Sequence, residues 1–254
     1  MVYVAFAFWL FALIFAARCI VLMWGQMVKP RVLAWILLPG TLTTELAFYL
    51  ASLLSGAEFR LPKSGEKADG KGGLGVASGG VPYLTPLLTG LMPVLACMAL
   101  ILVLVTRFGG AVFERFSLTQ AAAPMNLPLL TSSTIWDVLI GQVHLLQGAW
   151  AAVTGVLADW PWNAPQAWLF QYLVVCLIVR MAPVRRPMRP VLFGTAVVAI
   201  VISLAVQILS VGGNWLYDIW PLLSYAWATA LLLMALTLAV RGGVALTRIV
   251  MGKE

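Results

Sequence analysis

Long apolar runs, each about the length of a membrane-crossing helix, alternate with short polar segments along the chain. A helix needs about 20 apolar residues to cross the hydrocarbon core of a bilayer. Apolar residues make up 62% of the sequence and charged residues 10%, whereas charged residues make up roughly 25% of an average soluble domain. The runs of this length lie at residues 2–24, 32–54, 81–105, 135–157, 167–182, 191–209 and 219–240. We therefore expect an all-α fold, a polytopic integral membrane protein with about seven transmembrane helices in one membrane domain over residues 1–254.

The distribution of basic residues predicts the orientation of these helices, because lysine and arginine collect on the cytoplasmic side of membrane proteins. With the N-terminus outside and the C-terminus cytoplasmic, most of the 16 lysines and arginines fall on the cytoplasmic side, including the cluster from Arg180 to Arg189. The run at 135–157 is polar enough for an interfacial or re-entrant helix. If it did not cross the membrane, however, the cluster from Arg180 to Arg189 would lie on the outside, against the rule. We therefore expect it to cross, in a multi-pass protein of a bacterial inner (cytoplasmic) membrane.

The segment 58–80 is polar and rich in glycine from Gly65 onward. Polar, glycine-rich stretches between hydrophobic runs form loops. We expect a flexible extramembrane loop here, whose charged residues meet a partner protein or lipid headgroups.

The second run carries a carboxylate, Glu45, in the middle of an apolar helix. An ionisable group inside a bilayer costs several kcal/mol unless it is paired or functional. Glu45 is therefore either a neutral carboxyl hydrogen-bonded to a neighbouring helix or part of a retained water or proton site. Pro39 lacks a backbone donor, so we expect it to bend the helix and Thr41 to cap the second half.

The same stretch resembles the first motif of the site-2 protease-like zinc metallopeptidases of membranes, P-G-T-x-x-H-E-x-x-H-A followed by a short exit loop. Pro39, Gly40 and Thr41 match the lead-in, Glu45 falls on the family's catalytic glutamate, and Ser55-Gly56-Ala57 falls on the exit. A weaker similarity to a later turn of some relatives begins at Arg180, which again stands where a histidine is expected.

The two zinc ligands of the motif are missing, since Thr44 and Phe48 stand where the histidines should be. Imidazoles at positions i and i+4 lie on one helix face and hold the metal. A threonine hydroxyl is a poor zinc ligand, a phenyl ring is none, and His144 is the single histidine of the chain. The resemblance thus implies an inactive relative with no catalytic residue and no metal ligand, and no motif indicates a cofactor.

Residues at helical spacing in the run at 135–157 share one face, along which small side chains would let another helix approach closely. This face comprises Asp137, Gly141, His144, Gly148, Ala152 and Gly155. One hypothesis is that His144 faces Glu45 as the remnant of a metal or proton site. The alternative is that His144 is a core histidine satisfied near a helix contact, with Asp137 at the headgroups.

Tryptophans gather near predicted helix ends, where this residue anchors helices at the lipid-water boundary. They are Trp160, Trp162, Trp168, Trp215 and Trp220. Anchoring at this boundary explains the tryptophans, and the alternative is that they form a docking surface for a partner.

These patterns favour a non-catalytic membrane scaffold or accessory subunit, with other membrane protein subunits and lipids as its partners. Nucleic acid is not expected, because the basic residues follow membrane topology and form no continuous patch. Two alternatives stay open. One is an active intramembrane metal-dependent hydrolase with an atypical site. The other is a small proton-coupled transporter using Glu45, His144 and Asp137.

Overall fold

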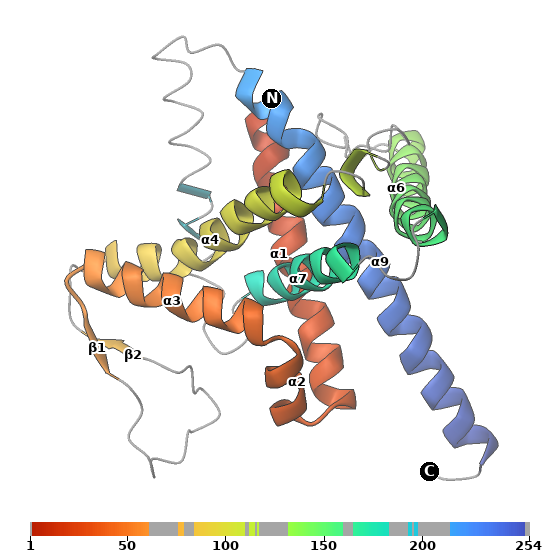
Figure 1. Ribbon diagram of the computed structural model, residues 1–254, viewed down its shortest axis with the longest axis horizontal. Helices are drawn as coiled ribbons and strands as arrows, with labels where there is room; N and C mark the ends of the chain where they lie inside the picture. The colour runs from red at the N-terminus through yellow and green to blue at the C-terminus, as the bar shows by residue number, and fades with distance from the viewer. Residues whose placement is uncertain are drawn as a thin grey trace.

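Helices make up most of the computed structural model (Figure 1). The structure describes residues 2–60, 76–78, 84–109, 112–114, 116, 132–159, 165–182, 193–194, 196–197 and 214–251. The helices are α1 (Val2–Met27), α2 (Pro30–Ile36), α3 (Leu38–Leu54), α4 (Leu84–Phe108), α6 (Ser132–Asp159), α7 (Pro165–Met181) and α9 (Asn214–Val250). Two short strands, β1 (Glu58–Arg60) and β2 (Val76–Ser78), lie between α3 and α4.

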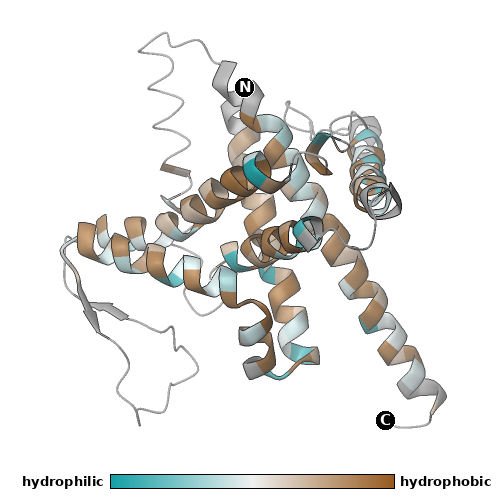
Figure 2. Cartoon of the chain, viewed as in Figure 1, coloured by the Kyte–Doolittle hydropathy of each residue, from teal (hydrophilic) through white to brown (hydrophobic). Residues whose placement is uncertain are grey.

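Three helices in the described part of the chain are long and apolar enough to cross a membrane. They contain the segments Ala5–Met27, Leu84–Phe108 and Ile219–Thr247, and each coincides with a predicted run. Hydrophobic residues extend along α1, α4 and α9 (Figure 2). The runs predicted at 32–54 and 135–157 are also helical, as α2 with α3 and as α6, but are not among these three. The run at 191–209 lies outside the described residues except for four positions.

The short helix α7 occupies the middle of the bundle (Figure 1), where it packs against α1, α3, α4 and α9. Four consecutive residues of α7, from Cys176 to Val179, are each at most 1% exposed. A helix that is apolar on all sides is a buried one. The position of α7 therefore follows from its sequence, which has no polar face through this stretch.

An aromatic cluster joins α9 to α7 at the centre of the core. Tyr225 lies 5.4 Å from Phe116, 6.1 Å from Phe113 and 6.4 Å from Phe170, measured between ring centroids. Its hydroxyl donates a hydrogen bond to Gln171 Oε1 over 2.9 Å. Edge-on and stacked rings at these distances add to the stability that burial provides.

A second contact joins α9 to α1. The Trp9 and Trp227 rings lie 5.4 Å apart, and Trp24 Nε1 donates to Thr237 Oγ1 over 2.8 Å. The two hydrophobic helices are thus held in register by an aromatic pair at one end and a hydrogen bond at the other.

The end of α3 and the two short strands that follow it are set by backbone hydrogen bonds. The helix ends in a Schellman motif, in which Gly56 has φ 66°, Ala57 N donates to Ser52 O, and Gly56 N donates to Leu53 O. The strands then pair antiparallel, with Phe59 opposite Ala77. The predicted extramembrane loop at 58–80 thus includes two paired strands, and its other positions, 61–75 and 79–80, lie outside the described residues.

Candidate functional site

The segment that resembles the metallopeptidase motif begins at a break between α2 and α3. Leu37 leaves the helical conformation with φ −96° and ψ 20°, and Pro39 follows in the first turn of α3. The predicted interruption is therefore present. The expected capping role of Thr41 is wrong, because its hydroxyl donates to Leu38 O over 2.8 Å while Leu37 takes the N-cap position.

The break leaves the carbonyl of Ile36 available to a neighbouring helix. The Tyr172 hydroxyl of α7 donates to Ile36 O over 2.6 Å, and Cys176 Sγ lies 3.5 Å from the same oxygen. A backbone carbonyl freed inside a bilayer needs a partner in the protein. These two side chains of α7 supply it.

Gly40 allows α3 to approach the backbone of α7 closely. A Cβ at this position would lie 2.3 Å from the Cys176 carbonyl oxygen and 3.0 Å from Arg180 Cβ. Such a contact involves backbone atoms, which cannot rotate away. The glycine of the Pro-Gly-Thr lead-in thus has a packing role, and it places the start of α3 next to Cys176 and Arg180.

The threonines at the start of α3 satisfy the carbonyls of their own helix. Thr43 Oγ1 donates to Pro39 O over 2.9 Å, and Thr44 Oγ1 lies 3.0 Å from both Gly40 O and Thr41 O. Such back-bonding is common for threonine inside helices. The hydroxyl at position 44 is therefore directed into α3.

The other two residues of the motif differ in burial. Phe48 is 5% exposed and packs as a core side chain. Glu45 is half-buried and has an interaction partner. Within the described residues, no group of three or more histidine, cysteine, aspartate or glutamate side chains is placed to hold a metal ion.

The structure does not bring Glu45 and His144 together. Glu45 belongs to α3, which packs against α4 and α7, whereas His144 belongs to α6, which packs against α9 on the other side of the bundle (Figure 1). His144 and Asp137 are both exposed, so the expectation of a buried core histidine is also wrong. The hydrolase and transporter hypotheses both rely on the pair that these helices keep apart.

The predicted small-residue face of α6 is in contact only along part of its length. Gly148 and Ala152 are buried, but a Cβ on Gly141 would meet no atom of the described residues within 4 Å. The polar contact to α9 comes instead from Gln142, whose Oε1 accepts from Trp227 Nε1 over 2.6 Å. Neither residue of this pair was assigned a role from the sequence, because the contact joins positions far apart in the chain.

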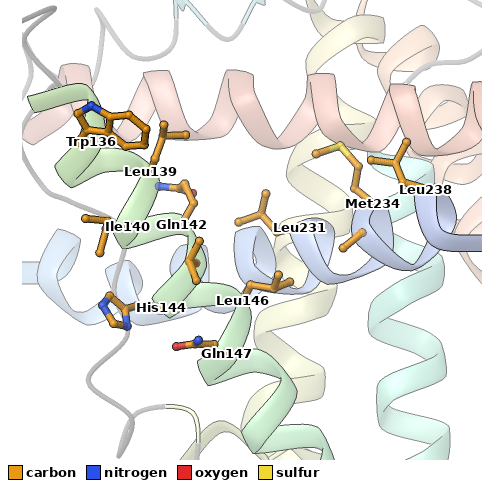
Figure 3. A pocket seen from close by; sticks show the side chains of 12 residues that line it. Trp136, Leu139, Ile140, Gln142, His144, Leu146, Gln147, Leu231, Met234 and Leu238 are labelled. Atoms are coloured by element: carbon orange, nitrogen blue, oxygen red, sulfur yellow. The ribbon is translucent and has the colours of Figure 1, made fainter. Parts of the chain in front are cut away.

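A pocket of about 480 Å³ lies between α6 and α9 beside this hydrogen bond. Figure 3 shows Leu139, Gln142 and Leu146 of α6 directed toward Leu231 and Met234 of α9. His144 lies on the other flank of α6 and borders the pocket. The lining is apolar apart from Gln142, His144 and Gln147.

The tryptophans singled out in the sequence do not form one surface. Trp168 is 48% exposed, whereas Trp220 is 1% exposed and belongs to the core, which excludes it from a docking surface. Trp215 lies in the first turn of α9, but its side chain is not among those that the structure describes. Trp160 and Trp162 lie outside the described residues.

Comparison of the chain with protein-family models, with curated proteins and with solved structures finds no match. The class of protein therefore rests on the structure itself. It is a helical membrane protein, with three candidate membrane spans among the described residues.

Proposed function

We propose that the protein is a non-catalytic scaffold or accessory subunit of a larger membrane complex, related to the site-2 protease-like zinc metallopeptidases but without their metal site. The observation that carries the proposal is the role of Thr44 and Phe48, the two residues that stand where the motif has its zinc-binding histidines. Thr44 uses its hydroxyl within α3, and Phe48 is part of the core. Catalytic zinc takes three protein ligands, and neither side chain can be one of them in this arrangement.

The matching residues of the motif support a retained structural role. Gly40 permits the contact between α3 and α7, and Gly56 forms the left-handed turn that ends α3. Both are consequences of backbone geometry and need no metal. A relative that had lost its catalytic ligands would keep these glycines for packing.

Exposed side chains on two helices support the role as a subunit. The outer side of α3 carries a row of exposed leucines, at Leu42, Leu46, Leu50, Leu53 and Leu54. On α6, Asp137, His144 and Gln147 are exposed. Polar side chains at membrane depth normally pair with protein groups. A neighbouring subunit that covers the outer flank of α6 would supply these partners.

The proposal includes seven crossings, an outside N-terminus and a cytoplasmic C-terminus in a bacterial inner membrane. Reporter fusions test this topology. A fluorescent protein fused after residue 254 is expected to fluoresce, and alkaline phosphatase inserted at residue 68 is expected to be active. Phosphatase activity at residue 254 would overturn the orientation.

Metal content and cross-linking together test the function. The protein extracted in mild detergent is expected to hold far less than one zinc per chain. A photo-reactive amino acid at position 144 is expected to give discrete protein adducts in intact membranes, while the matched exposed position 15 of α1 gives none. Near-stoichiometric zinc that is lost in Glu45→Gln, or identical labelling from positions 144 and 15, would refute the proposal.

A further inference from the structure

The helix α9 is longer than a bilayer requires. It has 37 residues, which at the rise of an α-helix makes it about 55 Å long, whereas the hydrocarbon core is about 30 Å thick. The candidate span within it, Ile219–Thr247, also exceeds the core, because its 29 residues extend over about 43 Å. A helix of this length tilts in the bilayer or extends past the core. Part of α9 therefore lies in the headgroup region or beyond it.

Contacts with α1 show which end of α9 extends. The Trp9 ring packs against the Trp227 ring. Later in both helices, Trp24, in the last turn of α1, donates a hydrogen bond to Thr237. The two helices therefore run in the same direction, and Thr237 lies level with the end of α1. Residues 238–250 continue α9 for about 20 Å more, and this part leads away from the other helices (Figure 1).

This part of α9 is exposed on every side. All residues from 238 to 247 are exposed, and they make up nearly three helical turns. The apolar side chains among them include Val244, which is 42% exposed, and Leu246, which is 66% exposed. A protein that docks on one face of a helix leaves the other faces uncovered, whereas lipid surrounds it. Exposure on all sides therefore favours lipid as the molecule that covers this segment.

The charges of the segment indicate the kind of lipid. Arg241 and Arg248 are seven residues apart, which is nearly two turns, so both positions lie on one side of α9. The sequence has no aspartate or glutamate from residue 219 to residue 253, and Lys253 adds a third positive charge. The same charges on a second copy of the helix would repel it. Basic residues without acidic neighbours at the end of a membrane helix complement the phosphates of anionic lipids.

We propose that residues 238–251 form a lipid-binding extension of α9, which lies in the headgroup region of the leaflet at which α1 ends and binds anionic phospholipid through Arg241 and Arg248. An arginine side chain is long enough to reach a phosphate while its helix stays among apolar chains. The attraction is electrostatic, so it depends on headgroup charge and weakens with salt. The inference rests on the membrane placement of α9 and is independent of the scaffold role.

Quenching by brominated lipids tests the position of the extension. An environment-sensitive fluorescent amino acid replaces Leu246 in the full chain, and a second protein carries it at Phe15, which is 64% exposed near the middle of α1. Each purified protein is reconstituted in phosphatidylcholine vesicles that contain a small fraction of brominated lipid. Bromine near the headgroup should quench position 246 more than bromine at the end of the acyl chain. Position 15 should show the opposite order, and aqueous iodide should quench neither position strongly.

The preference for an anionic headgroup is measured with the same probes. Brominated phosphatidylglycerol should quench position 246 at about fivefold lower mole fraction than brominated phosphatidylcholine at low salt, and position 15 should show no preference. The difference should disappear at about 1 M salt, where the Debye length falls to about 3 Å.

Two variants with equal loss of charge locate the preference. Arg241→Gln with Arg248→Gln should abolish it at position 246. Lys29→Gln with Arg107→Gln removes the same charge from two exposed residues on other segments and should leave it unchanged. If the first variant fails to fold, the salt dependence with unchanged arginines still decides.

Four results contradict the inference. Strong quenching of position 246 by iodide would place the extension in water. Equal quenching by the two brominated headgroups at low salt would remove the role of the arginines. Emission at position 246 that changes with the protein-to-lipid ratio would indicate a second copy instead of lipid. Shielding from iodide that occurs only in native membranes, and not in the vesicles, would indicate a protein partner.

Discussion

Replacing Gly40 by alanine places a methyl group where α3 meets the backbone of α7. The new Cβ would lie 2.3 Å from the Cys176 carbonyl oxygen, whereas ordinary contacts begin at 3.4 Å. The helices must then separate locally by about 1 Å, since neither a backbone carbonyl nor a Cβ can rotate out of the way. The hydrogen bond from Tyr172 to Ile36 O, which is 2.6 Å long, lies at the same contact and would lengthen.

The expected cost follows from these two effects. Overpacking in a well-packed core costs about 3 kcal/mol when side chains cannot relax, and a weakened hydrogen bond between membrane helices adds about 0.6 kcal/mol. The higher helix propensity of alanine compared with glycine offsets up to about 1 kcal/mol of this destabilisation. We expect Gly40→Ala to lower the free energy of unfolding by about 2–3 kcal/mol.

The assay is unfolding by dodecyl sulfate in mixed micelles, followed by tryptophan fluorescence. Gly25→Ala in α1 is the matched control, because a Cβ there would meet no neighbouring atom within 4 Å in the part of the chain that the structure describes. It should be neutral or stabilise by up to about 1 kcal/mol. A second readout is the thiol of Cys176, which is buried and should react faster with a maleimide in Gly40→Ala than in the wild-type protein.

The reasoning is refuted if Gly40→Ala unfolds within about 0.5 kcal/mol of the wild type and Cys176 stays equally protected. That outcome would mean that α3 and α7 are farther apart than described or move freely against each other.

Five further substitutions, at four positions, test contacts elsewhere, each by the same unfolding assay. Tyr225→Phe loses only the hydrogen bond to Gln171 and should cost about 0.6 kcal/mol, whereas Tyr225→Ala removes a buried ring and should cost about 4 kcal/mol; equal costs would contradict the role of the aromatic cluster. Trp24→Phe removes the donor to Thr237 and should cost about 1 kcal/mol, and Thr237→Val in that background should add little if the pair acts as one contact. Gly56→Ala must adopt φ 66° and should cost about 1 kcal/mol; a stabilised variant would show that the turn can rearrange.

Hydrophobic length alone predicted most of the helical framework. The segments around α1, α4, α7 and α9 are recognisable because an apolar run of about 20 residues has few other stable states. The burial of Cys176 to Val179 is of the same kind, since the run from Leu173 to Val179 contains no charged, amide or hydroxyl side chain to turn outward. The break before Pro39 was also readable, because proline lacks the donor that a continuous helix needs.

The contacts that define the site were not predictable in this way. The carbonyl of Ile36 is satisfied by Tyr172, and Gln142 by Trp227, and both pairs join segments that only the tertiary fold brings together. The same limitation explains why His144 was predicted to face Glu45. Residues on one helix face can be recognised from the sequence, but the helix that packs against that face cannot. The strands β1 and β2 are three residues each, too short to give a periodic signal.

The burial of α7 also bears on how the protein is made. α1, α3 and α4 are synthesised before α7, yet each of them packs against it. Until α7 is synthesised, the faces of these helices that it will cover have no α7 side chains against them, and the Ile36 carbonyl lacks the Tyr172 hydroxyl. The N-terminal helices therefore form an incomplete assembly until α7 has been synthesised. The lifetime of this assembly depends on the time that translation takes to reach the end of α7.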